Sequence, residues 1–130
     1  MTHVLPNISE LSRPWWEASR EERLLLPHCK ECGKHFFRPE VACTHCFSLN
    51  WEWVEASGQG TLYSFSEIHR PPVPGFRTPV IFAIVDLDEG PAIFSNVVDC
   101  SPDELKIGMR LKVTFDKLTD EITLPKFRPL

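Results

Sequence analysis

The pattern of hydrophobic and polar positions in the second half of the chain predicts a run of β-strands. The expected strands are residues 61–69, 80–87, 91–98, 109–118 and 122–127, which are rich in β-branched and aromatic side chains. Asp88-Glu89-Gly90 is a turn signal that joins the second and third strands into a hairpin. Residues 101–104 form a capping box with proline at the first helical position, so a short helix is expected there, ended by Gly108. Five strands with a small helix between the third and fourth are the layout of an OB-type barrel.

The first 26 residues are expected to be mostly helical after a short tail. Pro14 suits a first helical turn, because its missing N–H would have no partner there anyway. Ser19 opens a capping-box spacing, so the helix could break and restart near it, and residues 23–27 could equally be extended. On a helix the adjacent Trp15 and Trp16 point about 100° apart. One of them could therefore pack on the ribbon while the other faces a partner or an adenine ring, or both could simply cover the core.

Two Cys-x-x-Cys pairs, separated by ten residues, predict one structural zinc ion. The proposed ligands are Cys29, Cys32, Cys43 and Cys46. Zinc binds four ligands in a tetrahedron, and thiolate is its preferred structural donor. Gly33 follows the first pair, and a glycine there lets the backbone turn with positive φ and aim its N–H groups at the sulfurs. Residues 34–39 are expected to form a short strand, and the metal is expected to supply folding energy that so small a module lacks.

The same four thiolates could also hold iron or an iron–sulfur cluster, which stays open as the alternative metal. A redox Cys-x-x-Cys needs only one pair, and this chain has two. His28, His35 and His45 lie beside the cysteines and could substitute as ligands, although four thiolates already complete a shell. A closed shell activates no water, so the metal is expected to be structural. The fifth cysteine, Cys100, is expected to be a small buried apolar residue.

Composition and charge favour a globular protein of the cytoplasm. Of the 130 residues, 42% are hydrophobic and 25% are charged, and the net charge is −4. Zinc ribbons and OB barrels both occur in nucleic-acid-binding proteins, but residues 80–98 contain no lysine or arginine. No apolar run is long enough to span a membrane, and residues 1–10 lack the features of a signal peptide. An autonomous enzyme is disfavoured, because His69 is the only histidine of the predicted barrel and no recognisable catalytic set surrounds it.

An ordered set of short motifs runs through nearly the whole chain. It comprises Trp15-Trp16, Leu24 to Gly33, Phe36 to Pro39, the second cysteine pair, Gly58 to Phe65, Pro71 to Phe76, Val85 to Gly90, Ile107-Gly108 and Leu124 to Pro129. This set resembles the zinc-ribbon OB-fold acyl-CoA-associated family, long labelled domain of unknown function thirty-five. One departure is Thr44, where the second cysteine pair often carries a proline. The expected fold is mostly β, with an N-terminal helical segment (1–26), a rubredoxin-like zinc ribbon (27–57) and a five-stranded OB-fold barrel (58–130).

The resemblance implies a non-catalytic subunit of a hetero-oligomer. Members of the family accompany thiolase-like enzymes, including aldolases that shorten sterol side chains, and some accompany acyl-CoA hydratases. They help to form the acyl-CoA channel, often through the N-terminal helix and the ribbon. Candidate contacts with CoA or the partner are Trp15, Trp16, Arg20, Lys34, Phe36, Phe37, Arg38, Val73 and Phe76. The apolar members would supply exposed interface area, and the basic members could meet CoA phosphates. An accessory subunit of a hydratase and a nucleic-acid-binding module are the alternatives.

Overall fold

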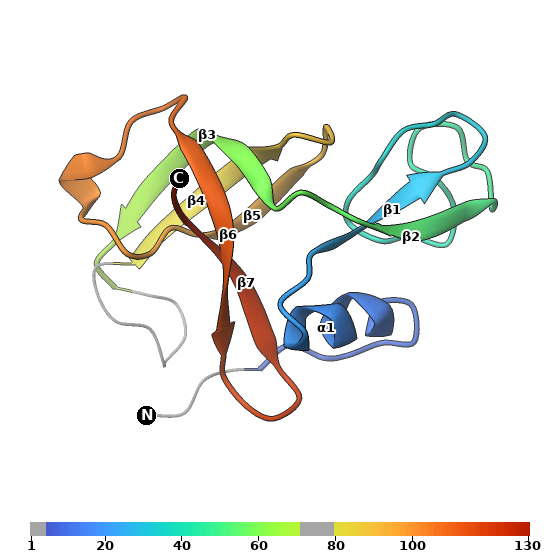
Figure 1. Ribbon diagram of the computed structural model, residues 1–130, viewed down its shortest axis with the longest axis horizontal. Helices are drawn as coiled ribbons and strands as arrows, with labels where there is room; N and C mark the ends of the chain where they lie inside the picture. The colour runs from blue at the N-terminus through green and yellow to red at the C-terminus, as the bar shows by residue number, and fades with distance from the viewer. Residues whose placement is uncertain (1–4, 71–79) are drawn as a thin grey trace.

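The computed structural model describes residues 5–70 and 80–130, which form two antiparallel sheets and one α-helix (Figure 1). In chain order the elements are α1 (Arg13–Arg20), β1 (Leu25–Cys29), β2 (Trp51–Glu55), β3 (Gln59–Ile68), β4 (Val80–Leu87), β5 (Ala92–Asn96), the 3₁₀-helix η1 (Pro102–Glu104), β6 (Arg110–Lys117) and β7 (Thr123–Pro129). β1 and β2 form one sheet, and the other has the strand order β5-β4-β3-β6-β7. The predicted contacts Val73 and Phe76 lie outside the described residues.

α1 carries Pro14 in its first turn, as predicted, and ends at Arg20. The Ser19 hydroxyl donates to the carbonyl oxygen of Trp15 at 2.9 Å, one turn back in the same helix. It therefore caps no second helix, and the predicted restart at Ser19 is wrong. Glu22 has a positive φ of 58°, which turns the chain into the extended strand β1. In the described part of the chain, no helix has the length and apolarity needed to cross a membrane.

The two-stranded sheet carries the first cysteine at its far end, because Cys29 of β1 lies opposite Trp51 of β2. The short strand predicted at residues 34–39 is wrong. Only His35 makes a β-bridge there, and its partner is His28 of β1. After this bridge the chain leaves β1 and turns toward the second cysteine pair, so no ladder can extend.

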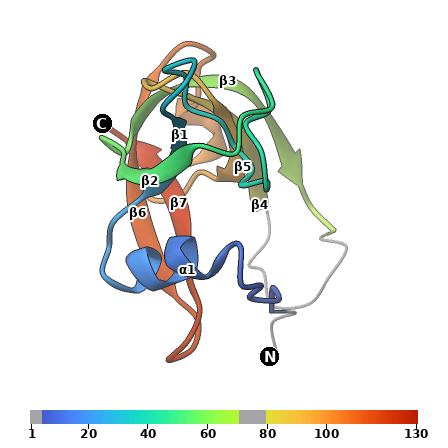
Figure 2. The same cartoon turned by 90° about the vertical axis from the view of Figure 1, so that its right-hand side faces the viewer.

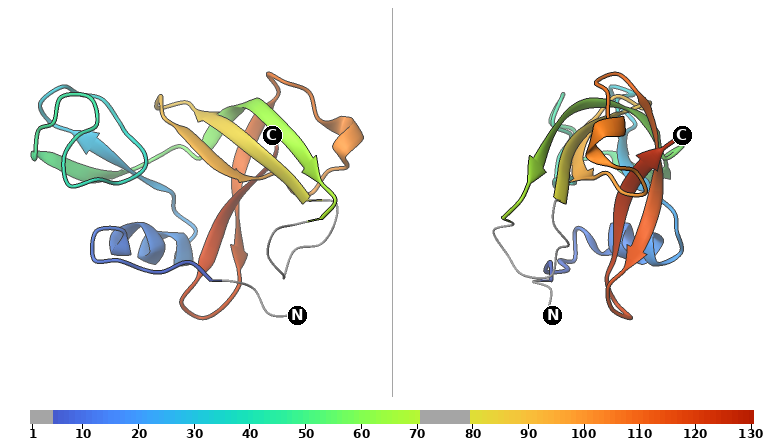
Figure 3. Two further views of the ribbon diagram at one scale, coloured as in Figure 1. Left: turned by 180° about the vertical axis from the view of Figure 1, so that it is seen from behind. Right: turned by 90° about the vertical axis from the view of Figure 1, so that its left-hand side faces the viewer.

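The five-stranded sheet curls into a nearly closed barrel (Figure 3). A register shift after Leu62 marks a bulge in β3, and bulges of this kind bend a strand. The chain after β5 closes the barrel, because Val97 bridges Phe127 of β7. The Ser95 hydroxyl adds a hydrogen bond to the carbonyl oxygen of Pro125 at 2.7 Å. All five strands predicted from the sequence pattern are present, and the predicted mostly-β fold with an OB-type barrel is confirmed.

The helix predicted before Gly108 is shorter than expected. The capping box is present, with the Ser101 N–H donating to Glu104 Oε1 at 3.2 Å. Leu105, however, takes an extended conformation (φ −78°, ψ 135°) and is buried in the barrel core. The helix therefore stops after three residues, since continuing it would carry Leu105 away from the core.

One hydrophobic core fills the barrel and reaches into the ribbon sheet. Its buried members are Leu24, Leu26, Ala56, Leu62, Ile81, Ala83, Val85, Leu87, Ile93, Val97, Leu105, Leu111 and Phe127. Leu24, Leu26 and Ala56 lie at the ends of β1 and β2 nearest the barrel, so this core anchors that end of the ribbon. α1 packs below the ribbon sheet, against β1 and β7 (Figure 2). Cys100 packs on the same core and burial raises the pKa of its thiol, which fits the predicted apolar role.

Candidate metal centre and neighbouring pockets

Two backbone turns with the same hydrogen bonds carry the four cysteines. In each turn the residue after the second cysteine donates its N–H to the carbonyl oxygen of the first: Gly33 to Cys29 at 3.0 Å, and Phe47 to Cys43 at 2.9 Å. In each turn the first cysteine also donates its own N–H to the carbonyl five residues ahead, at 2.9 Å. The two turns, called knuckles below, therefore present their cysteines in equivalent positions.

The four sulfur atoms fit a single zinc ion. Sγ atoms of Cys29, Cys32, Cys43 and Cys46 all lie within 4.8 Å of one another. Cys29 and Cys46 are 3.6 Å apart, and Cys32 and Cys43 are 3.7 Å apart. A tetrahedral zinc with bonds of about 2.3 Å holds its sulfurs ~3.8 Å apart. An iron–sulfur cluster places its own sulfides between the cysteines and needs a wider cage, so the cluster does not fit. A single iron, the other part of that alternative, takes the same four-thiolate shell as zinc.

Backbone N–H groups stabilise the thiolates that zinc requires. The Cys32 N–H donates to Cys29 Sγ at 3.5 Å, and the His45 N–H donates to Cys43 Sγ at 3.3 Å. The hydrogen bond from Cys32 is the main cause that lowers the pKa of Cys29 to about 7. Four thiolates close the shell and leave no position for a water, so the chemistry of this site is structural.

The three histidines beside the cysteines lie outside the sulfur cluster. The rings of His28 and His35 face each other with centroids 4.8 Å apart. His45 Nε2 lies 3.2 Å from the carbonyl oxygen of His35. Within residues 5–70 and 80–130, the four cysteines are the only group placed to hold a metal, so the predicted shell of cysteines alone is confirmed.

Phe36 belongs to a small core beside the metal site and not to the surface. Its side chain is 1% exposed, and its ring lies 5.6 Å from that of Trp51 in an edge-on arrangement. The buried Cys29 and Cys43 complete this second core. The expectation that Phe36 offers exposed apolar area is therefore wrong.

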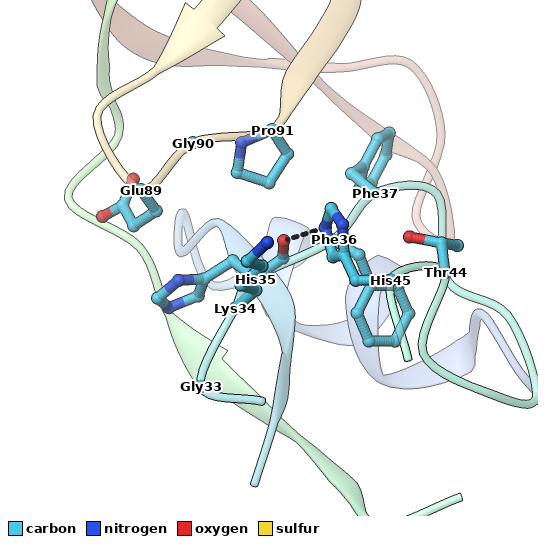
Figure 4. A pocket seen from close by; sticks show the side chains of 10 residues that line it. All are labelled: Gly33, Lys34, His35, Phe36, Phe37, Thr44, His45, Glu89, Gly90 and Pro91. Atoms are coloured by element: carbon cyan, nitrogen blue, oxygen red, sulfur yellow. Dashed lines mark hydrogen bonds between the residues drawn. The ribbon is translucent and has the colours of Figure 1, made fainter. Parts of the chain in front are cut away.

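A pocket of about 380 Å³ lies between the ribbon and the turn that joins β4 to β5 (Figure 4). Its lining residues include Lys34, His35, Phe37 and His45 from the ribbon, and Glu89 and Pro91 from the turn. Glu89 Oε2 accepts the N–H of Ser57 at 2.7 Å, whereas Glu89 Oε1 is buried and has no hydrogen-bond partner among the described residues. Burial, followed by the charge of His28, lowers the pKa of His35. The pocket, here called the ribbon–turn pocket, can thus receive a ligand that has both charged and apolar parts.

A smaller pocket of about 170 Å³ lies beside α1. Its lining residues are Ile8, Arg13, Trp16, Glu17, Arg20 and Glu121. The Trp15 side chain points from the helix toward the ribbon. The centroid of its ring lies 4.7 Å from that of Trp16 and 6.0 Å from that of Phe37. The predicted contact residues are therefore divided. Lys34, Phe37 and the buried Phe36 line the ribbon–turn pocket, Trp16 and Arg20 line the pocket at α1, and Trp15 packs on the barrel core.

Sequence reasoning missed part of the ribbon–turn pocket. His45 was considered only as a ligand, and Glu89 only as part of a turn signal. The predicted contact Arg38 is exposed and lines neither of the two pockets. Glu89 meets the ribbon because its carboxylate binds the backbone of Ser57, and no local sequence signal announces such a contact.

The fold and the metal site define a zinc ribbon followed by an OB-fold barrel. Residues 16–52 match the ChsH2 rubredoxin-like zinc ribbon domain, and residues 53–116 match the ChsH2 C-terminal OB-fold domain. The chain belongs to this ChsH2 family of DUF35 proteins, so the predicted resemblance is confirmed, as is the predicted single structural zinc.

The chain matches only part of some relatives and most of others. It is 38% identical to a probable enoyl-CoA hydratase alpha subunit of Thermomonospora curvata, over 95% of this chain but only 39% of that protein. It is 32% identical to a DUF35 domain-containing scaffold protein of Methanothermobacter thermautotrophicus, over 88% of this chain and 87% of that one. Among solved structures it is similar to a chain of the Ltp2-ChsH2(DUF35) aldolase, with a TM-score of 0.87, 38% identity and coverage of 96% and 98%.

Proposed function

We propose that this chain is a non-catalytic subunit of an acyl-CoA-processing complex and that its partner is a thiolase-like aldolase. The acyl-CoA would carry a sterol or fatty acyl side chain. The observation that carries this proposal is the similarity to the Ltp2-ChsH2(DUF35) aldolase chain, because it covers 96% of this chain and 98% of that one. The solved chain has no further domain beyond the part that matches. Its association with an aldolase therefore belongs to the fold that it shares with this chain.

The chemistry of the described residues supports a non-catalytic role. The zinc shell is closed by four thiolates, so it cannot activate water or polarise a substrate. Cys100 packs against the barrel core, and burial raises the pKa of its thiol, whereas an activated nucleophile needs a lowered pKa. The bond-breaking groups would therefore come from the partner, and this chain would contribute surface and binding.

The ribbon–turn pocket is our candidate for the part of the CoA channel that this chain contributes. CoA combines phosphates with an adenine ring and a long pantetheine arm. Lys34 supplies a positive charge at the pocket and Phe37 supplies an aromatic ring. Trp16 and Arg20 offer the same combination at the pocket beside α1. Trp15 contacts Trp16 of one pocket and Phe37 of the other, so the two pockets lie on either side of this side chain, and a long ligand or a partner segment could reach both.

A hydratase partner is the second candidate, and specific relatives favour it. Besides the Thermomonospora curvata protein, the chain is 28% identical to the 3-oxo-4,17-pregnadiene-20-carboxyl-CoA hydratase alpha subunit of Mycobacterium tuberculosis, over 88% of this chain and 37% of that one. In contrast, 44% identity to a benzoylsuccinyl-CoA thiolase subunit of Geobacter metallireducens, over 53% of this chain, favours the thiolase-like class. Nucleic-acid binding is the weakest alternative, because the net charge is −4 and β4 and β5 contain no lysine or arginine.

The test is reconstitution with a thiolase-like aldolase subunit. Sedimentation should detect a hetero-oligomer, and aldol cleavage of an acyl-CoA should require both subunits. Parallel assays with an enoyl-CoA separate the hydratase alternative. Within the complex, Lys34→Glu should raise the KM for acyl-CoA about tenfold with little change in kcat; the exposed Lys106 gives the matched control, Lys106→Glu. A chain that stays alone and leaves the partner's activity unchanged, or that turns over acyl-CoA by itself, would refute the proposal.

A further inference from the structure

The second knuckle places a phenylalanine where the first places a glycine. Gly33 and Phe47 make equivalent backbone hydrogen bonds, and both have positive φ, +76° and +65° respectively. Glycine adopts this conformation freely, whereas a side chain with a Cβ adopts it at a cost in free energy. Phe47 is therefore held in a conformation that disfavours it, by a turn that glycine would fit better.

The cost is not recovered by packing within the described chain. Phe47 is 79% exposed, and two further apolar side chains of the same loop, Val41 and Leu49, are 71% and 72% exposed. The loop itself is well tied down, because the Trp51 indole N–H donates to the Val41 carbonyl at 2.9 Å and Cys43 donates to the Ser48 carbonyl at 2.9 Å. The exposed side chains Val41, Phe47 and Leu49, called the knuckle surface below, thus stand on a rigid support.

The charge of this loop indicates the kind of partner it suits. Residues 41–50 contain no Asp, Glu, Lys or Arg, although a quarter of the whole chain is charged. Figure 1 shows this part of the ribbon at the end of the molecule away from the barrel, free of other elements. The charges nearest to the loop are the zinc thiolates and Glu31, which accepts a hydrogen bond from the Asn50 side chain at 3.1 Å. A rigid apolar projection at the end of a molecule fits an apolar pocket on another protein.

We propose that the knuckle surface is a docking contact for the enzyme subunit of the complex proposed above, with the Phe47 ring seated in an uncharged apolar pocket of that subunit. This inference rests on the proposed function. The area of the surface favours that occupant over a second copy of this chain. The three side chains expose on the order of 400 Å², given that a whole aromatic side chain buries about 150–250 Å². A stable interface needs about 800 Å² on each side, so this surface serves as one anchor within a larger contact.

Phe47→Gly is the discriminating substitution, because it removes the ring and relieves the backbone at once. We expect the Tm of the free chain to be unchanged or higher, while the Kd for the thiolase-like subunit, measured by sedimentation or titration, rises at least about tenfold. Leu49→Ser should weaken binding in the same direction. The matched control is Ile107→Ser, which removes another exposed apolar side chain (62% exposed) from the barrel end of the molecule.

The outcomes separate this inference from the proposed function. If the wild-type chain binds the enzyme subunit and Phe47→Gly and Leu49→Ser bind it equally well, the docking contact is refuted and the proposed function stands. If Phe47→Gly lowers the Tm, the ring has a structural role and the docking contact is refuted as well. An Ile107→Ser variant that loses as much affinity as Phe47→Gly would also refute it, since the effect would then be general apolarity. Failure of the wild-type chain to bind any such subunit overturns both proposals.

Discussion

At the scale of single residues, Cys43 is one of the two buried zinc ligands of the ribbon. It binds the metal and also forms part of the small core with Phe36. We expect Cys43→Ser to remove the zinc and to cost at least about 3 kcal/mol of folding free energy, because a structural zinc supplies much of the stability of such a module. Elemental analysis and thermal unfolding measure both effects. Cys100→Ser is the matched control and should keep one zinc; a Cys43→Ser protein that also keeps one would contradict the prediction.

The ion pair between Asp88 and Arg110 gives a residue-scale prediction on pH. Arg110 donates to both carboxylate oxygens of Asp88, at 2.7 Å and 2.8 Å, and these hydrogen bonds lower the pKa of Asp88 in the folded chain. A carboxylate with a lowered folded-state pKa adds stability above its unfolded pKa, and the stability is lost as the pH falls through the folded-state value. Asp88→Asn should therefore lower the Tm near pH 7.

The same difference should shrink as the pH falls from the unfolded-state pKa of Asp88 through its lowered folded-state pKa, because the wild-type carboxylate then becomes protonated too. The effect is modest in size, since both side chains are about two-fifths exposed. Thermal unfolding at several pH values measures it. Asp120→Asn is the control, because Asp120 is fully exposed and lies 3.6 Å from Lys117. A Tm difference for Asp88→Asn that is constant with pH would contradict the assignment.

At the scale of elements, the two tryptophans of α1 have different surroundings. Trp15 packs on the barrel core and on Phe37, whereas Trp16 lines the pocket beside the helix. Trp15→Ala should cost about 2 kcal/mol of folding stability, less than for a fully buried tryptophan. Trp16→Ala should cost less than about 1 kcal/mol of stability, yet weaken assembly with the enzyme subunit by a similar 2 kcal/mol if the helix meets that subunit.

Denaturant unfolding and sedimentation of the two variants separate these effects. Trp15→Phe and Trp16→Phe are the matched controls, because each keeps an aromatic ring at its position. Each should keep most of the folding or binding free energy that the corresponding alanine variant loses. Equal losses of stability in Trp15→Ala and Trp16→Ala would contradict the different packing of the two side chains.

The elements also show why some strands could be predicted and others could not. β4 has the bounds predicted from residues 80–87, because its alternating side chains face a core on one side and solvent on the other. β1 was anticipated only in part, as residues 23–27 that could be extended, because it holds Pro27 and the ligand Cys29, and its composition is set by the metal as much as by the sheet. β2 carried only a weak signal, because the alternation of Trp51, Glu52 and Trp53 is broken by Val54. Assigning it as a strand also required knowing that it pairs with β1.

At the scale of the whole molecule, the metal site was predictable and the ribbon–turn pocket was not. Four cysteines on two short turns specify their own geometry, since spacing alone brings each pair together. The pocket exists only because the β4–β5 turn reaches back to the ribbon, where Glu89 binds the Ser57 backbone. Such a contact depends on how the two sheets pack, and no local pattern of residues records it.

Because the molecule has two separate cores, we expect zinc removal to unfold only part of it. The barrel core contains none of the metal ligands, whereas the small ribbon core is built around Cys29 and Cys43. A strong chelator should therefore unfold the knuckles and leave the barrel folded. Leu24, Leu26 and Ala56 limit the unfolding, because they hold the near ends of β1 and β2 in the barrel core.

Limited trypsin digestion followed by mass spectrometry measures this response directly. After chelation, cleavage should become rapid at Lys30 and Lys34, which lie in the ribbon, while Lys112 and Lys126 in the barrel sheet should stay protected. Adding zinc back should restore the original pattern, which serves as the control for damage by the chelator. Equal cleavage of ribbon and barrel would mean that the two cores unfold as one unit. In that case the zinc would stabilise the whole molecule, and loss of enzyme-subunit binding on chelation could not be assigned to the ribbon. If only the ribbon opens, the same loss of binding would place the contact on the ribbon, where the knuckle surface stands.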